Sequence, residues 1–232
     1  MKIDFTDAVS ALCCAWNELI DIPCPFVKPE DGRNNELIPA AFPVIGWVTG
    51  MIVALAGALI SAVFNIYAGG VIFAILAWCV LTFKDSCRGD TILCRNIKII
   101  PFDKSLIFVP WLLRFVLLLI IGVMGCKWYF ALVIAGGFAM QALVATDIEC
   151  RVSLLPDTPE ARRMLIIVSA VIAVVTFPFC RLETALAVVV FAGLYMFFAK
   201  RIGEFAGEEA VEKISNYGCI TEWALLFAGI LF

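Results

Sequence analysis

Long apolar stretches separated by short polar segments dominate the chain. No charged residue occurs between Pro39 and Phe83, and the turn-forming stretch Asn65 to Gly69 divides this run into two. An α-helix needs about 20 apolar residues to cross the hydrocarbon core of a bilayer, so each such stretch is a candidate span. The pattern predicts spans over residues 41–64, 70–83, 105–123, 128–146, 164–179 and 184–199, with a short or re-entrant final stretch over 220–232.

The N-terminal residues follow a different pattern, because Met1 to Asp21 mixes acids with apolar residues. This mixture is typical of a helix that lies in the membrane interface, and it does not fit the apolar core of a cleavable signal peptide. We therefore expect an all-α polytopic integral membrane protein with six or seven transmembrane helices and an N-terminal amphipathic helix. It forms a single domain, divided into an N-terminal segment (1–38) and a helical bundle (39–232).

Composition agrees with a membrane protein. Hydrophobic residues make up 63% of the chain and charged residues 16%, and the mean hydropathy is +1.01, well above the range of soluble domains. A net charge of −3 without a basic patch predicts no nucleic-acid partner. The ten cysteines form no CxxC pair and there is no histidine, which argues against a zinc site and for reduced thiols in apolar surroundings.

Lysine and arginine predict the orientation. All but Arg114, Lys127 and Arg181 of the 17 basic residues fall in the N-terminal segment or in the loops 84–104, 147–163 and 200–219. The positive-inside rule places these segments in the cytoplasm. We therefore expect a multi-pass protein of the inner membrane whose active face is cytoplasmic.

The segment FKDSCRGDTILCRN, residues 83 to 96, is the first candidate for chemistry. Asp85 and Asp90 offer the carboxylate oxygens that Mg²⁺ prefers, and Mg²⁺ is commonly held by one or two carboxylates plus substrate phosphates. Arg88 and Arg95, interleaved with these acids, complement phosphate oxygens. The alternative is an ordinary interfacial loop whose cations serve only the topology.

Glycine patterns mark two further segments. Gly46 and Gly50 have the spacing that lets two helices approach closely in a membrane. Gly203 and Gly207 precede Glu208 in an acidic segment, where backbone amides can approach a phosphate and the carboxylate can meet a cation.

Taken in order along the chain, these features resemble the motifs of one enzyme family. A proline-containing segment precedes the first span, a FPLxGxxxG motif opens it, a DGLADxxDG motif follows the second span, and a GGxTGD-type motif precedes the last. The matching positions in this chain are 21–25, then Phe42, Pro43, Gly46 and Gly50, then Asp85 and 89–91, then Gly203, Gly207 and Glu208. The chain therefore resembles the cobalamin-5′-phosphate synthase family (adenosylcobinamide-GDP ribazoletransferase).

Several polar positions depart from that family. Asp85 and Asp90 stand one residue further apart than the first two motif aspartates, and Leu93 or Cys94 replaces the third. The family's histidine is missing, its RDxxxGxxG segment survives only around Asp103, and residues 139–141 stand where it has an arginine. The apolar scaffold is kept while polar positions are lost.

The resemblance implies a transferase of cobamide biosynthesis that joins adenosylcobinamide-GDP to α-ribazole or its 5′-phosphate and releases GMP with Mg²⁺. It implies that Asp85 and Asp90 are the catalytic, metal-binding acids, with Asp103 and Glu208 as further metal ligands. It also implies phosphate binding, and the matching residues are Arg88, Arg95, Gly203 and Gly207. The bilayer is the surrounding partner, and an oligomer is left open.

Two alternatives remain. The chain can be a degenerate paralogue that binds a corrinoid or a protein partner without turnover. Alternatively, Asp147 and the sequence Pro156-Asp157 echo the aspartyl proteases that process prepilins, although the two acids stand two residues further apart and no GxGD motif follows. A simpler interpretation of that segment is a helix stop and restart, with Asp157 or Thr158 as the cap.

Overall fold

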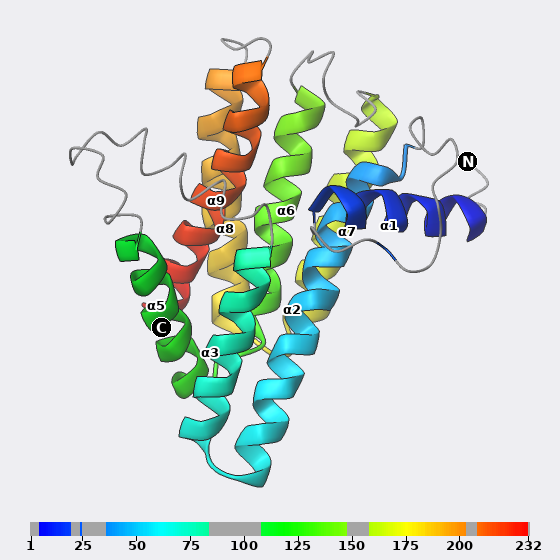
Figure 1. Cartoon of the computed structure of the whole chain (residues 1–232). Coiled ribbons are helices and arrows are strands. Elements are labelled where there is room, and N and C mark those ends of the chain that lie inside the picture. Colours follow the sequence, from blue (N-terminus) through cyan, green and yellow to red (C-terminus); the bar gives the residue numbers. More distant parts are fainter. Residues whose placement is uncertain are drawn as a thin grey trace.

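The computed structural model describes residues 5–19, 24, 36–83, 108–147, 158–202 and 208–231. The described residues form helices and no strands, which confirms the prediction of an all-α protein (Figure 1). The eight helices are α1 (Phe5–Leu19), α2 (Ile38–Val63), α3 (Ile66–Phe83), α5 (Phe108–Met124), α6 (Tyr129–Asp147), α7 (Pro159–Thr176), α8 (Arg181–Ile202) and α9 (Glu208–Ile230).

The N-terminal helix is amphipathic, as predicted. In Figure 1, α1 lies across the bundle instead of along it. Ala11, Ala15 and Leu19 recur at a spacing of four residues, so they share one face, and all three are buried. Phe5 and Leu12 are exposed. The helix thus packs one stripe against the bundle and leaves other apolar side chains uncovered.

Local capping explains where two helices begin. The side-chain oxygen of Asn65 accepts a hydrogen bond from the backbone N–H of Ala68 at 2.8 Å, so α3 starts four residues earlier than the apolar pattern predicted. At α7, Thr158 Oγ1 accepts from the N–H of Ala161 at 3.1 Å, and Pro159 occupies the first helical position. This arrangement confirms the helix restart, with Thr158 as its cap.

The last helix is longer than predicted. The apolar stretch 220–232 indicated a short or re-entrant end, whereas α9 runs from Glu208 to Ile230, over 23 residues. The cause is that backbone hydrogen bonds continue through a charged first segment that hydropathy alone assigns to a loop.

The expected count of six or seven spans is not supported. Three described helical stretches are long and apolar enough to cross a bilayer: α2, residues 129–146 of α6 and residues 181–198 of α8, with mean hydropathies of 2.1, 1.7 and 1.6. The apolar parts of α3 and α5, residues 66–82 and 109–124, are shorter. Charged side chains at the beginning of α7 and α9 interrupt their apolar runs.

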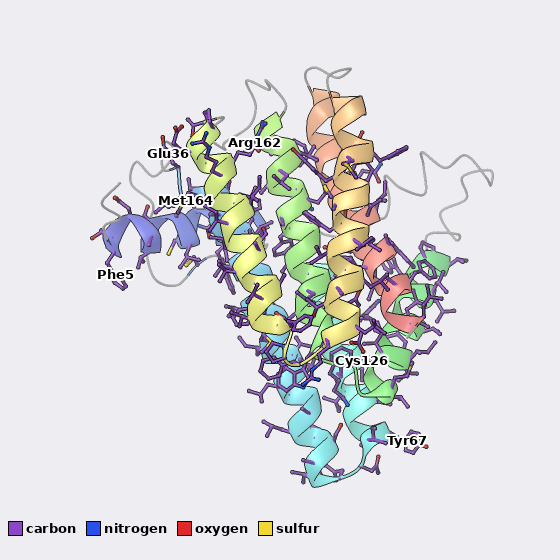
Figure 2. The ribbon with its side chains drawn as sticks, turned by 180° about the vertical axis from the view of Figure 1, so that it is seen from behind. Phe5, Glu36, Tyr67, Cys126, Arg162 and Met164 are labelled. Carbon is purple, nitrogen blue, oxygen red and sulfur yellow. The ribbon has the colours of Figure 1, made fainter. Side chains whose placement is uncertain are left out.

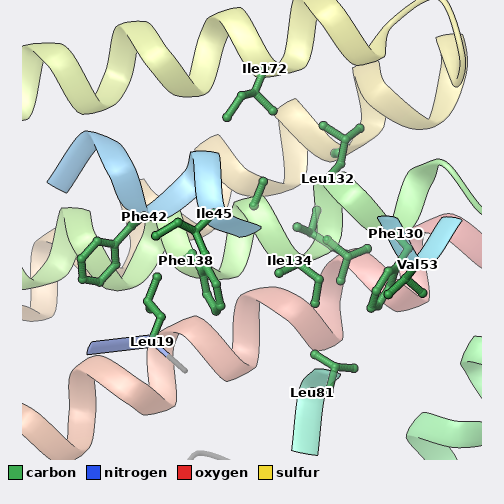
Figure 3. Packing of buried hydrophobic residues seen from close by; sticks show 14 of the residues in the cluster. Leu19, Phe42, Ile45, Val53, Leu81, Phe130, Leu132, Ile134, Phe138 and Ile172 are labelled. Atoms are coloured by element: carbon green, nitrogen blue, oxygen red, sulfur yellow. The ribbon is translucent and has the colours of Figure 1, made fainter. Parts of the chain in front are cut away.

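The helix α6 forms the centre of the bundle, since 94% of its apolar stretch is buried. Figure 3 shows Phe42 and Ile45 of α2 packed beside Ile134 and Phe138 of α6. A Cβ atom added at Gly50 would lie 2.5 Å from Ala131 Cα, and one at Gly46 would lie 2.9 Å from the carbonyl oxygen of Ile134. The predicted close approach of helices at these two glycines is therefore confirmed, and α6 is the helix they approach.

Candidate functional site

The sequence-predicted site residues lie mostly outside the described part of the chain. This holds for Asp85, Arg88, Asp90, Arg95 and Asp103 between α3 and α5, and for Gly203 and Gly207 between α8 and α9. Glu208 is the first residue of α9, but its side chain is also outside the description.

The helix ends that flank these segments lie on one side of the bundle. The C-terminal ends of α3 and α8 and the N-terminal ends of α5 and α9 all point upward in Figure 1. In the same view, α3 and α5 end lower than α6, α8 and α9. A charged side chain in the first turns of α5 therefore stands well below the upper end of α9.

Such a charge is Arg114, which meets α9 inside the bundle. Its Nη2 atom lies 3.8 Å from Oε2 of Glu222, and the two side chains are only 5% and 2% exposed. The same nitrogen donates to Cys219 Sγ at 3.4 Å, and the guanidinium lies 5.1 Å from the ring centre of Trp223. These three α9 residues are spaced at i, i+3 and i+4, so one face of α9 surrounds the cation.

Polar side chains continue from this pair toward α6. The Glu222 side chain packs against Gly137, where an added Cβ would collide with the carboxylate, and the Gln141 side chain packs in the same way against Gly218. Gln141 and Asn216 are both buried. We call Arg114, Gln141, Asn216, Cys219 and Glu222 the buried polar cluster; it lies where α5, α6 and α9 meet.

Two buried polar atoms near the ion pair have no hydrogen-bond partner within the residues that the structure describes. They are the indole nitrogen of Trp111, one turn before Arg114 on α5, and Oδ1 of Asn216, one turn before Cys219 on α9. A buried donor or acceptor without a partner costs about 1–3 kcal/mol. Both residues precede the ion pair on their helices, toward the beginnings of α5 and α9.

An ion pair buried among apolar helices adds little to the stability of the folded protein, so its presence suggests a functional role. Removing two charges from water costs several kcal/mol per ion, and ionisable residues inside a membrane usually mark functional sites. Arg114 keeps its charge at any physiological pH, so Glu222 serves as its counter-ion. The cluster can hold α5 against α9, and its amides and guanidinium can bind a polar or anionic group.

A second group of ionisable residues lies at the opposite end of the bundle. Lys127, in the turn between α5 and α6, is buried, and Cys126 Sγ donates to Oε1 of Glu183 in the first turn of α8 at 3.7 Å. Burial lowers the pKa of Lys127 and raises the pKa of Cys126, and the Glu183 carboxylate raises the latter further. Figure 2 shows Cys126 far from Arg162, which marks the other end.

Arg162 joins the two helix ends that flank the segment 148–157. Its Nη2 atom donates to the carbonyl oxygen of Thr146 in the last turn of α6 at 3.0 Å. Such a bond satisfies a carbonyl that the helix itself leaves without a partner. Asp157 lies outside the described residues, and so does the side chain of Asp147.

The described residues contain no cluster of potential metal ligands. Among them, no three His, Cys, Asp or Glu side chains stand close enough together to hold a metal ion. The acids that the resemblance implies as ligands are outside the description, so the metal stays a prediction.

The apolar pattern placed Arg114 inside the predicted span 105–123 and Glu222 inside the final apolar stretch 220–232, but it did not pair them. The useful signal was the charge itself, because an arginine or glutamate inside an apolar run needs a partner. Which partner it finds depends on the packing of α5 against α9.

The described fold and the buried polar cluster define an all-α protein with three helices of membrane-spanning length and a charged interior. No protein-family model matches the chain, and neither a curated protein nor a solved structure is similar to it at a significant level.

Proposed function

We propose that this chain is a membrane-embedded transferase of the cobalamin-5′-phosphate synthase type. It joins adenosylcobinamide-GDP to α-ribazole or its 5′-phosphate and releases GMP, at a site on the cytoplasmic face of the helical bundle. The observation that carries the proposal is the order of motifs. A proline-glycine motif in α2, an acidic segment after α3 and a glycine-rich acidic segment before α9 follow one another as in that family.

The arrangement of the helix ends supports this proposal. The segments 84–107 and 203–207 are sequence-distant, yet the helices that carry them have the corresponding ends on the same side of the bundle (Figure 1). One site built from both segments is therefore compatible with the fold.

The buried polar cluster gives further support. Arg114 is six residues into α5, about 9 Å along the helix axis from its beginning at Phe108. A fixed cation and polar side chains thus lie near the beginning of α5, the helix that follows the segment carrying Asp85 and Asp90 in the sequence. Such a group suits a substrate with negative charge better than a neutral one.

The proposed reaction asks the protein for positioning and charge neutralisation. The ribose hydroxyl attacks the phosphorus attached to cobinamide, the bond to the bridging oxygen breaks, and GMP leaves with that oxygen. Arg88 and Arg95 bind phosphate oxygens, and the backbone amides at Gly203 and Gly207 add hydrogen bonds. Magnesium, when bound, neutralises part of the charge of the diphosphate.

Release of GMP by purified protein is the direct test. We expect turnover with adenosylcobinamide-GDP and α-ribazole, and at least a 10–100-fold loss in Asp85→Asn and Asp90→Asn, the usual effect of disturbing a metal site. Asp157→Asn is the matched control and should keep full activity. Size-exclusion profiles must show that all three variants stay folded. Loss at Asp157 with retention at Asp85 would favour the protease interpretation instead.

The loss of polar motif residues favours one competing function, a degenerate paralogue that binds a corrinoid without turnover. If the missing third aspartate only weakens metal binding, Leu93→Asp or Cys94→Asp should lower the magnesium concentration needed for half-maximal rate. Absence of GMP at every magnesium concentration, with no rescue by either variant, would leave the binding protein as the better account.

Topology can be tested separately from activity. In a background without native cysteines, a reporter cysteine near Lys127 should react with a membrane-impermeant maleimide added from outside. Reporters at positions 90, 155 and 208 should react only after the membrane is opened. Labelling of position 90 from outside would contradict the proposed orientation.

A further inference from the structure

A cavity of about 250 Å³ opens on the side of the bundle formed by α6, α7 and α8. Its floor is one face of α6, on which Leu132, Gly136, Ala139 and Leu143 line the cavity. Because a helix rises 1.5 Å per residue, these positions span about 17 Å along the axis. The cavity is therefore a slot that runs along the helices.

Small side chains keep the slot open. Ala170 and Ala173 of α7 form one wall, and Ala187 and Ala192 of α8 form the other. Figure 2 shows α7 and α8 on either side of α6, with α6 visible between them. A larger side chain at any of these alanines would narrow the slot.

The slot opens sideways onto an apolar surface. Ala170 and Ala192 line it and are also exposed, as are Ile166 and Val188 at 50% and 49%. Ser169 contributes the one polar side chain of the lining, and its hydroxyl has no hydrogen-bond partner in the part of the chain that the structure describes. With α8 in a bilayer, the opening meets hydrocarbon.

We propose that this slot binds one acyl chain of a membrane lipid. The shape selects the occupant, because a volume of about 250 Å³ over a length of about 17 Å leaves a cross-section of about 15 Å², whereas a helix of a second copy is 10–12 Å wide with its side chains. An empty apolar slot would leave its lining atoms without dispersion contacts, and a methylene chain supplies those contacts along its length. The inference does not depend on the proposed transferase activity.

Photo-crosslinking in vesicles tests the proposal. The full chain is reconstituted in phosphatidylglycerol and phosphatidylethanolamine with a phospholipid that carries a diazirine in the middle of one acyl chain, and the labelled residues are mapped by mass spectrometry. Among the α6 residues that line the slot, Gly136 is partly exposed, whereas Leu132, Ala139 and Leu143 are buried, so a chain in the slot meets α6 around Gly136. We expect labels on α6 between residues 132 and 143.

Two filling variants and one matched control sharpen the test. Ala170→Phe and Ala192→Phe place a ring in the slot from opposite walls and should each lower the labelling of α6 about tenfold, the equivalent of about 1.4 kcal/mol. Ala185→Phe adds the same bulk at an exposed α8 position outside the lining and should leave the labelling unchanged. Labels confined to outward side chains, such as Ile167 and Val174, would overturn the proposal, and so would crosslinks between two copies across this face.

Discussion

Glycines lie at two contacts of the central helix α6, the contact with α2 and the contact with α9, but they act differently in the two. Toward α2, Gly46 and Gly50 bring backbone against backbone, and an added Cβ would meet main-chain atoms of Ile134, Ala135 or Ala131. This contact is close at both glycines. No flexible atom is available to move aside.

Toward α9, the glycines make room for side chains. The Glu222 side chain fills the space beside Gly137, that of Gln141 the space beside Gly218, and the Tyr129 ring the space beside Gly229. Of these three side chains, those of Gln141 and Tyr129 are polar and that of Glu222 is charged.

The difference separates two kinds of membrane contact. Where two backbones touch, the stability of the contact depends on the absence of any side chain, and the contact contains no functional group that could bind or react. Where a glycine accommodates a polar side chain, the contact depends on which residue lies opposite. We therefore expect the α9 face to tolerate changes that keep charge balance, and the α2 face to tolerate almost none.

The largest effect is expected from breaking the charge balance of the α9 face. Glu222→Leu removes the carboxylate beside the buried Arg114 and should lower the free energy of unfolding by about 3–5 kcal/mol. The double variant Arg114→Leu/Glu222→Leu removes both charges and should recover most of that loss. Denaturation of the purified protein in detergent measures both. A double variant as unstable as Glu222→Leu would contradict the assignment of the pair.

A smaller effect is expected from one methyl group on the α2 face. Gly50→Ala places a Cβ 2.5 Å from Ala131 Cα, so the helices must separate, at a cost of about 1–3 kcal/mol. The matched control is Gly193→Ala in α8, where nothing lies within 4 Å of the new atom. That variant should be stabilised by about 0.5–1 kcal/mol through its better helix propensity. Equal changes in the free energy of unfolding of the two variants would show that the α2–α6 contact is looser than described.

The smallest effect is expected from a single hydrogen bond on the α9 face. Tyr129 donates to the carbonyl oxygen of Leu225 at 2.9 Å, and Tyr129→Phe keeps the ring beside Gly229 while it removes this bond. The loss should be about 0.6–1 kcal/mol, as for other hydrogen bonds between membrane helices. Tyr67→Phe, at an exposed position, is the control and should melt like the parent protein. A loss above that of Gly50→Ala would reverse the expected order of these two effects.

Local features of this chain were readable from the sequence. The amphipathic N-terminal helix, the break near residue 65, the restart of α7 at Thr158 and the close-approach glycines of α2 all depend on residues near one another along the chain. Capping and helical periodicity act over a few positions, so the pattern alone carries them. The beginning of α9 was not predicted, because a charged helical turn and a charged loop have the same hydropathy.

The sequence by itself determined that the chain is helical, apolar and built for close helix contacts, because those properties follow from composition and spacing. Tertiary structure alone decided that α6 is the helix beneath Gly46 and Gly50, and that Arg114 meets Glu222. It also decided that alanines of α7 and α8 leave a slot between them. Each of these facts depends on which helix faces which, and that choice is made by the packing of surfaces far apart in sequence.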